Sequence, residues 1–414
     1  MNNTKLKNLC ISITDCPHST PLWTDKGRLV LRNFNIKKGH LDFSSVFYTD
    51  DDHYFTRIRR NRPESGDIVI TREAPMGEAC IIPAGFECCL GQRMVLLKSN
   101  TNLVVSKYLL YALLSDFVQL QIKLNGGTGT TVSNLRIPYL ENLSIPIPPL
   151  PEQQKIADIL STVDEHISET ESLIEKTKVL KQGMMQRLLT KGIGHTEFKD
   201  TEIGRIPVEW EVVNTEAILF SAKGSLKIGP FGSQLRKEFL QESGPFRVYG
   251  QENIFNNDFI IGKRYLSKSM YEKLESCKIQ SGDILISMMG TIGKCSIVPS
   301  SIAPGIMDSH LIRLRVDDQK ADKPYVKYLV AESSLIQKQI KQLSVGGIMD
   351  GLSSGIIKQL LFPLPPLPEQ QKIASILTSI DDQIDSHLIK LTAQTKLKSA
   401  LMQQLLTGKT RVKI

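Results

Sequence analysis

The sequence predicts an α+β protein in which two similar mixed α/β domains are separated by two long antiparallel helices, with a pseudo-twofold relation between the halves. Three observations predict this fold. One proline-led segment occurs twice, each copy opens a long stretch with helical spacing of apolar residues, and each stretch follows a region of short strand-like and helical patterns. The chain therefore reads as a single unit, a domain followed by a helix, that is present twice.

The proline-led segment sets the register of the repeat. Residues 148–156 read P-P-L-P-E-Q-Q-K-I, and residues 365–373 repeat this sequence at an offset of 217 (365 − 148 = 217). Pro151 and Pro368 suit the first turn of a helix, where a missing N–H costs nothing. The offset holds without a gap to Gly408, and a glycine just past the last turn is a typical helix terminator. Each copy therefore predicts one helix, roughly 60 Å long at 1.5 Å per residue.

Apolar residues in both copies recur at the spacing of one helical face. The first copy has Ile156, Ile159, Leu160, Val163, Ile167, Leu173, Ile174, Leu180, Met184 and Leu188. The second copy has Ile373, Ile376, Leu377, Ile380, Ile384, Leu388, Leu391, Leu397, Leu401 and Leu405. We expect the two faces to form a coiled-coil-like spacer centred on Ile156, Leu160, Val163, Ile167, Ile373, Leu377, Ile380 and Ile384. The alternative is two unrelated surface helices, each packed on its own domain.

The same patterns divide the chain into six segments. We expect a first domain at residues 1–147, a spacer helix at 148–191, a connector at 192–210, a second domain at 211–364, a second spacer helix at 365–408 and a basic tail at 409–414. In the first domain, strands are predicted at residues 28–32, 67–70 and 79–82, a helix at 107–122 and a Gly/Thr-rich loop at 126–131. In the second domain, residues 281–286 realign with 65–70, and Gly346-Gly347 takes the place of Gly126-Gly127.

Composition and charge limit the classes of function. The net charge is +8 with a pI near 9.0, which permits a polyanionic partner without proving one. No apolar run is long enough for a membrane span. The seven cysteines contain no C-x-x-C pair, so they predict neither a disulfide framework nor a zinc site and indicate a reducing cytoplasm.

The connector bears on how the helices pair. Parallel pairing would require residues 192–210 to run back along the rod, and about 19 residues reach at most some 65 Å. Antiparallel pairing is therefore preferred, with one domain at each end of the spacer. DNA has a local twofold axis, and symmetric readers place their half-sites about one helical turn apart. Two unlike domains would read two unlike half-sites, and hence an asymmetric, bipartite sequence.

Three motifs carry a family resemblance. They are the doubled P-P-L-P-E-Q-Q-K-I-A helix opening, the S-G-D-I-L-I…G-T-I-G-K pattern of residues 281–294 and the connector I-G-R-I-P-V-E-W at 203–210. Together they resemble the DNA-specificity (S) subunit of Type I restriction–modification systems, over essentially the whole chain. The resemblance implies two target-recognition domains, double-stranded DNA as the target, and two methylation (M) and two restriction (R) subunits as partners. In one departure, T-R-E-A at 71–74 replaces S-M-M-G at 287–290, so that hairpin end is expected to differ.

Catalytic motifs are missing from the sequence. There is no P-loop, no amino-methyltransferase tetrapeptide and no H-E-x-x-H motif. Asp67 and Asp283 each precede a predicted strand, where capping of a turn is the better interpretation. The chain is therefore expected to be a non-catalytic subunit without a cofactor or a metal. S-adenosylmethionine, ATP and Mg²⁺ are expected in the partner subunits.

Candidate DNA contacts are basic and amide side chains in predicted loops, because such groups bind phosphates and base edges. In the first domain they are Lys37, Lys38, Arg57, Arg59, Arg60, Arg62 and Arg93. In the second domain they are Gln251, Asn253, Asn256, Asn257, Lys263 and Arg264. The four arginines at 57–62 are expected on the DNA backbone. The main alternative for the whole chain is a helical scaffold that binds protein partners without reading DNA, and a second is a self-contained nuclease or methyltransferase.

Overall fold

The computed structural model describes residues 2–125, 134–344 and 352–413. The chain forms two compact units, and each unit is discontinuous in sequence. The first contains Met1–Ser172 and His387–Ile414, and the second contains Leu173–Ser386. Each unit therefore holds one mixed α/β domain together with half of each long helix. The predicted loops at 126–131 and at Gly346-Gly347 lie outside the described residues.

The first unit is built on two packed sheets. Its four-stranded antiparallel sheet has the order β2 (Cys10–Asp15), β10 (Met94–Ser99), β7 (Ile68–Thr71) and β8 (Ala79–Ile81). Its three-stranded sheet has the order β6 (Tyr48–Thr49), β3 (Arg28–Leu31) and β9 (Cys88–Leu90), with β3 and β9 parallel. Two smaller pairs join β1 (Asn2–Lys5) to β11 (Ser144–Ile147) and β4 (Ile36–Lys37) to β5 (His40–Leu41).

The second unit repeats the four-stranded sheet, the three-stranded sheet and the β1–β11 pair of the first in the same strand order. Its four-stranded sheet has the order β15 (Leu226–Ile228), β21 (Leu311–Leu314), β18 (Ile284–Ser287) and β19 (Cys295–Ile297). Its three-stranded sheet has the order β17 (Tyr265–Leu266), β16 (Phe246–Tyr249) and β20 (Gly305–Met307), again with one parallel pair. The pair β14 (Glu211–Asn214) and β22 (Leu361–Leu364) corresponds to the pair β1 and β11 of the first unit. A further hairpin, β12 (Phe198–Thr201) and β13 (Gly204–Pro207), follows the first long helix.

The central strands are buried on both faces. Side chains alternate along a strand, so Ile68 and Ile70 of β7 face one apolar cluster, which includes helix α3, while Val69 faces another. The second unit shows the same division, with Ile284 and Ile286 in one cluster and Leu285 in the other. Strands buried on both sides read as continuous apolar runs, which explains the predicted runs D-I-V-I and D-I-L-I.

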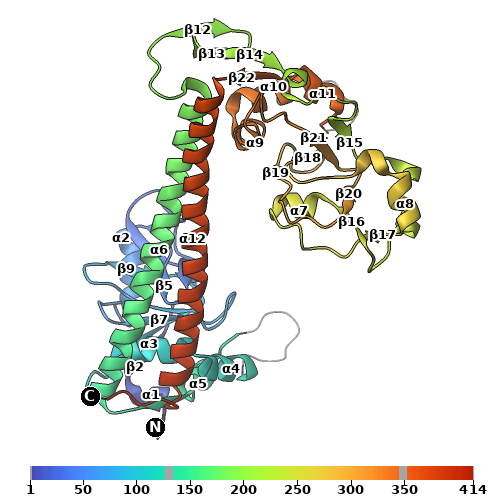
Figure 1. The fold of residues 1–414 in the computed structure, drawn as a ribbon. Coiled ribbons are helices and arrows are strands. Elements are labelled where there is room, and N and C mark those ends of the chain that lie inside the picture. Colours follow the sequence, from blue (N-terminus) through green and yellow to red (C-terminus); the bar gives the residue numbers. More distant parts are fainter. Residues whose placement is uncertain (1, 126–133, 345–351, 414) are drawn as a thin grey trace. The chain divides into compact units, whose positions relative to one another are not determined.

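Short helices cover these sheets (Figure 1). The first unit has α1 (Leu6–Leu9), α2 (Asp51–Ile58), α3 (Ser106–Leu114), α4 (Asp116–Asn125), α5 (Ile137–Glu141) and the 3-10 helix η1 (Asn33–Asn35). The second has α7 (Gln251–Phe255), α8 (Lys268–Lys273), α9 (Lys323–Glu332), α10 (Ser334–Ser344), α11 (Ser354–Gln359) and the 3-10 helices η2 (Thr215–Ile218), η3 (Gly232–Gln234), η4 (Lys237–Phe239) and η5 (Glu275–Cys277).

The prediction of one helix at residues 107–122 was wrong, because the helix breaks at Ser115. This residue has an extended backbone, with ψ at 148°. Its hydroxyl donates to the Ala112 carbonyl at 2.6 Å, and its carbonyl accepts from Val118 N–H. A buried serine thus ends α3 and starts α4, and the apolar periodicity on both sides conceals the break.

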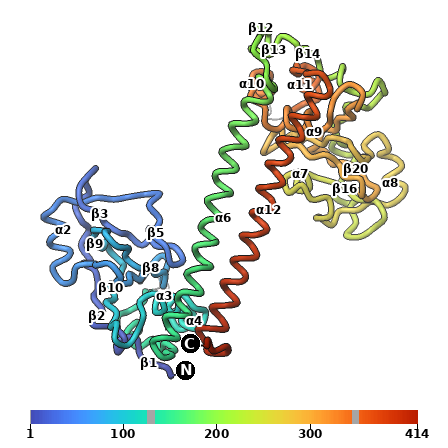
Figure 2. Tube along the Cα trace, turned by 60° about the vertical axis from the view of Figure 1, so that its left-hand side comes forward, coloured from blue at the N-terminus to red at the C-terminus, as the bar shows by residue number. Residues whose placement is uncertain are grey.

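The two long helices are confirmed as α6 (Leu150–Lys191) and α12 (Leu367–Leu405). In the first unit, the start of α6 lies beside the end of α12, since Glu152 pairs with Arg411 and Asp164 with Lys398. In the second unit, Lys181 near the end of α6 pairs with Asp381 near the start of α12. Figure 2 traces α6 in green and α12 in red. The further along α6 a paired residue lies, the lower is the residue number of its partner on or beyond α12. The two helices are therefore antiparallel within each unit.

The expected apolar stripe is buried mainly near the domains, with Ile174 near the middle of α6 also buried at 4% exposure. Ile156, Leu160, Ile373, Leu377 and Ile380 are buried, whereas Val163, Ile167 and Ile384 are half-buried. The prediction was wrong for four other stripe positions, which are exposed by 43–53%: Leu173, Leu180, Leu388 and Leu397. The ends of the helices therefore pack into domain cores, while these four apolar side chains nearer the middle face outward.

The hairpin end in the first domain differs from that of the second, as expected, because its Ala74–Pro75 peptide bond is cis, but other features of the turn are shared. Ala74 and Gly290 occupy the same place and both have positive φ, at 44° and 69°. The hydroxyl of Thr71 donates to the Pro75 carbonyl, as the Ser287 hydroxyl does to that of Thr291. The hydroxyl bond at the start of the turn and the positive φ are therefore present with alanine as well as with glycine at this position. Among the described residues, no helix is long and apolar enough to cross a membrane.

Candidate nucleic-acid interface

Side chains of the repeated helix opening fasten each long helix to its own domain. The Gln153 side-chain carbonyl accepts from Val105 N–H at 2.9 Å, and the matching Gln370 accepts from Asp322 N–H at 2.9 Å. Both glutamines are 1% exposed. Because a buried amide left unpaired is costly, these bonds explain why the opening sequence is the same in both copies.

Arg57 is buried inside the first domain and is withdrawn from the candidate DNA contacts. It is 6% exposed, and its guanidinium donates to the carbonyls of Leu90, Ser19 and Pro17 at 2.8, 2.8 and 3.1 Å. A guanidinium that makes these three bonds has no free face for a phosphate. Burial lowers the pKa of Arg57, so the surrounding carbonyls compensate for lost hydration. Its role is to hold the 17–19 loop against β9.

The other three arginines of the 57–62 run are on the surface. Arg59 and Arg60 are exposed and have no ionic or hydrogen-bonding partner within the described ranges. Arg62 is exposed and pairs with Glu87 at 2.5 Å. The first two are therefore the cations of this run that are ready to neutralise a phosphate, and Arg62 would have to exchange its partner.

The remaining candidates of the first domain are paired to different degrees. Lys37 is bound to Asp42, whose pKa the lysine lowers to about 2. The Lys38 side chain is exposed, with the backbone at φ 46°. Arg93 lies 3.2 Å from a carboxylate oxygen of Glu73. Lys38 is therefore the most available of the three.

Two amide candidates of the second domain are used by the fold. Asn253 is 1% exposed, accepts from Gly250 N–H at 2.9 Å and donates to the carbonyls of Asp258 and Ile261. It fixes the turn after α7 and is withdrawn as a base reader. Gln251 is half-buried and donates to the Met289 carbonyl at 2.6 Å.

The other candidates of this domain surround the same turn. Asn256 donates to the Glu252 carbonyl at 2.7 Å, and Asn257 has a positive φ of 47°. Arg264 bridges Glu252 and Asp308 at 2.6 and 3.0 Å. Lys263 is exposed without a partner among the residues described. Lys263 is therefore the free cation of this group, while Arg264 is a structural ion pair.

Sequence reasoning missed two lysines that only the fold brings together. Lys227 on β15 and Lys273 at the end of α8 line one recess of about 390 Å³ in the second domain. Neither lysine has an ionic or hydrogen-bonding partner in the described part of the chain. They are 46 positions apart (273 − 227 = 46), so no local cluster in the sequence could have indicated them.

The groups that resemble catalytic residues have structural roles. Asp67 and Asp283 accept from the N–H of Glu64 and Gln280, each at 2.9 Å, which confirms the turn-capping interpretation. Residues 290–294 lie in the β18–β19 hairpin and do not form a phosphate-binding loop. Within the described ranges, no three His, Cys, Asp or Glu side chains are placed to hold a metal.

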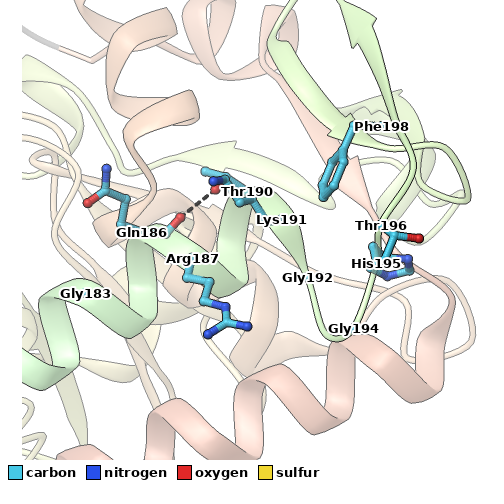
Figure 3. A pocket seen from close by; sticks show the side chains of 10 residues that line it. All are labelled: Gly183, Gln186, Arg187, Thr190, Lys191, Gly192, Gly194, His195, Thr196 and Phe198. Atoms are coloured by element: carbon cyan, nitrogen blue, oxygen red, sulfur yellow. Dashed lines mark hydrogen bonds between the residues drawn. The ribbon is translucent and has the colours of Figure 1, made fainter.

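A groove of about 730 Å³ lies in the second unit where α6 ends and the chain turns toward β12 (Figure 3). Its lining consists of Gly183, Gln186, Arg187, Thr190, Lys191, Gly192, Gly194, His195, Thr196 and Phe198. The Thr190 hydroxyl is bonded to the Gln186 carbonyl at 2.5 Å, and His195 Nε2 lies 2.9 Å from Glu369 Oε1. Thr190 and His195 are thus engaged by contacts within the fold, and the lining as a whole is polar.

Comparison with known proteins identifies relatives over nearly the whole chain. The family model described as "Type I restriction modification DNA specificity domain" matches residues 26–180 and 207–396. A Methanocaldococcus jannaschii chain described as the type I restriction enzyme MjaX specificity subunit is 31% identical over 397 residues, covering 94% of this chain and 88% of the relative. The MjaVIII specificity subunit of the same organism is 30% identical over 332 residues, covering 78% and 75%.

Solved structures agree on the fold. The crystal structure of a Type I restriction–modification S subunit from M. genitalium matches with a TM-score of 0.60 at 18% identity, covering 98% of this chain and 96% of that one. The family match in two regions agrees with the two similar mixed α/β units and their shared long helices.

Proposed function

This chain belongs to the family of Type I restriction–modification DNA specificity subunits, and we propose that it reads an asymmetric, bipartite DNA target with one domain for each half-site. As a specificity subunit it is not the catalytic chain of its complex. One observation carries the proposal: the two domains share their strand order, yet their exposed polar side chains differ. A shared scaffold with unlike surfaces suits two unlike half-sites.

Each domain would combine two kinds of contact. Exposed cations such as Arg59 and Arg60 would bind phosphates, which position a protein on DNA without reading its sequence. Amides and other polar groups on neighbouring loops would read base edges. Because α6 and α12 are shared by both units, the distance between the two half-sites is expected to depend on helix length.

The chemistry would come from other subunits. Methyl transfer would use S-adenosylmethionine in the methylation subunits, and cleavage and translocation would use ATP and Mg²⁺ in the restriction subunits. This chain would align those subunits with the target. Its seven thiols suit a reducing compartment, so we expect it to act in the cytoplasm.

The outward-facing apolar residues of the long helices are our candidates for docking methylation subunits. Leu180 on α6 is 53% exposed, and Leu397 on α12 is 52% exposed. They are equivalent positions of the repeat (397 − 180 = 217), with one in each unit. Two equivalent apolar positions would hold two copies of one partner, and we therefore propose two methylation subunits for each specificity chain. Two restriction subunits would then join that complex.

Exchange of one domain tests the function. Residues 1–147 would be replaced by the first domain of another specificity subunit, and methylated bases would be mapped in a host that carries the complete system. We expect only one half of the methylated sequence to change. Changes in both halves would refute the assignment of one domain to each half-site. A helical scaffold that does not read DNA would leave both halves unchanged, and its complex with the methylation subunit would show no gel shift on target DNA.

A further inference from the structure

The second domain contains an open recess between the strand β15 and the helix α8. Lys227 and Ile228 contribute from β15, Phe231 from the following loop and Gln234 from η3. Lys273 and Ser276 contribute from α8 and η5. The recess measures about 390 Å³ and is open to solvent. It is larger than the volume of a few water molecules, and its two free cations point to an anionic occupant.

The first domain has the same site, but an arginine fills it. The equivalent recess there is lined by Thr14, Asp15, Cys16, Pro17 and Arg57, among others, and measures about 10 Å³. Arg57 closes it by bonding to three backbone carbonyls. The N-caps of the matching helices, Asp50 of α2 and Ser267 of α8, are 217 positions apart (267 − 50 = 217), and counting from them places Leu274 at the position of Arg57 (274 − 57 = 217). The shorter leucine leaves the recess open.

The charges around the recess favour an anion. Among the described residues that line it, none is acidic. The nearby carboxylates are engaged elsewhere: Glu272 lies 3.9 Å from Lys268, Glu275 lies 3.2 Å from Lys278, and Glu216 lies 3.3 Å from Lys358 at the rim. Lys227 and Lys273 therefore have no counter-ion among the described residues. A lysine ammonium binds phosphate as a point charge.

We propose that this recess receives the phosphodiester backbone of the DNA half-site read by the second domain, with Lys227 and Lys273 neutralising phosphates there. The inference rests on the proposed function and specifies where the second domain holds DNA. The loop beside the recess supports it. Phe231 is 58% exposed, on a loop that Gly232 turns through a φ of 50°. An exposed ring at a phosphate site is placed to contact a sugar or the methyl group of thymine.

The salt dependence of binding tests the proposal. Lys227→Gln and Lys273→Gln would be combined in the full chain, assembled with its methylation subunits, and binding to a duplex carrying the target would be measured at several salt concentrations. Each lost phosphate contact should reduce the slope of log K against log salt by about 0.9. We therefore expect the slope to fall by about 1.8, with affinity roughly ten-fold weaker or more at moderate salt.

Two further variants make the test specific. Lys338→Gln with Lys341→Gln, both exposed on α10, removes the same charge elsewhere in the second unit and should leave the slope unchanged. Ser276→Glu places a carboxylate in the recess at an exposed position, and should weaken DNA binding without a cost to folding.

The outcomes separate this inference from the proposed function. If the wild-type complex does not bind the target, the proposed function itself fails. If the wild type binds but the Lys227/Lys273 variant keeps its slope, only the recess assignment is overturned. A variant that keeps its slope yet loses its methylation subunits would show that the recess binds protein, which also overturns the assignment. A reduced slope with intact assembly and an unchanged α10 control supports it.

Discussion

Asp164 on α6 and Lys398 on α12 lie 2.6 Å apart, and the repeat reproduces the pair with exchanged helices as Asp381 and Lys181, also at 2.6 Å. Tyr111 donates its hydroxyl proton to Asp164 at 2.8 Å, as Tyr328 does to Asp381 at 2.7 Å. Each carboxylate therefore joins both long helices to a domain helix. Burial raises the pKa of Tyr111 far above its usual value, so the tyrosine stays a donor at any working pH.

Asp164→Asn should destabilise the first unit. The change removes the charge that pairs with Lys398, and both side chains are less than a fifth exposed. A partly buried ion pair that loses one partner leaves a poorly solvated charge, and we expect a loss of about 2 kcal/mol in chemical denaturation. Glu165→Gln, at the next and exposed position, removes the same charge without a partner and is the control. Equal stabilities of these two variants would argue against a structural role for the pair.

Glu369→Gln should loosen the connector that follows α6. The Glu369 carboxylate accepts from Ile193 N–H at 2.9 Å and from the Trp210 indole at 3.1 Å, and it contacts His195 at 2.9 Å. Gly192 lies so close that a Cβ there would be 2.5 Å from Glu369 Oε1. Since hydrogen bonds to a charged acceptor contribute about 1.5–3 kcal/mol each, we expect a loss of at least about 2 kcal/mol.

Tryptophan fluorescence and proteolysis detect this loosening. Trp210 is fully buried, whereas Trp23 is 39% exposed, so a Trp23→Phe background leaves Trp210 as the reporter. Glu369→Gln should shift the Trp210 emission to the red and increase cleavage near Gly192. The neighbouring Lys372→Gln, on the exposed side of α12, should change neither. A Glu369→Gln protein with unchanged emission would show that the carboxylate does not hold the connector.

Acid should release the C-terminal tail from the first unit. Arg411 donates to both oxygens of Glu152 at 2.7 and 2.6 Å, and these hydrogen bonds hold the pKa of Glu152 below its usual value. A carboxyl group whose pKa is lower in the folded state contributes stability above its unfolded pKa, near 4.3. That contribution is lost as the pH falls through the lowered value.

Arg411→Gln should therefore lower stability at pH 7, because it leaves the buried Glu152 carboxylate without its partner. The difference from wild type should shrink below about pH 4 and vanish once Glu152 is protonated. Denaturation at a series of pH values measures this, and Lys413→Gln, which removes a tail charge without a partner in the described residues, is the control. A difference that stays constant down to pH 2 would contradict the assignment.

The sequence predicts the repeated scaffold well because its signals are periodic. The apolar spacing of α6 and α12 and the doubled opening segment leave few alternatives. Ser115 breaks a helix with a single hydroxyl, which apolar periodicity does not register. Arg57 and Arg59 look alike in sequence, yet one is buried because three backbone carbonyls happen to surround it. Leu180 belongs to the apolar stripe but faces outward. Apolar spacing predicts a helical face, but it does not predict which part of that face another element covers.

Two classes of arginine in one run should behave differently. Arg59→Gln with Arg60→Gln should leave folding unchanged and reduce the salt slope of DNA binding by about 1.8, because two phosphate contacts are lost. Arg57→Gln should instead lower the free energy of unfolding by about 2 kcal/mol or more, since it leaves buried carbonyls without donors. Thermal denaturation and salt-dependent gel shifts of the complex measure the two effects. A stable Arg57→Gln protein with a reduced slope would return Arg57 to the DNA contacts.

Leu180 and Leu397 should each be needed for the binding of one methylation subunit. An aspartate at either position puts a charge on an apolar contact, which a partner would have to desolvate. Leu180→Asp and Leu397→Asp should each reduce a complex with two methylation subunits to one, and the double variant should bind none, as measured by native mass spectrometry. Neither change should affect folding, because both side chains are about half exposed. Val179→Asp, at a 69% exposed position beside Leu180, tests whether the contact with the methylation subunit extends beyond Leu180. Loss of both partners from either single variant would show that the two positions do not act as independent sites.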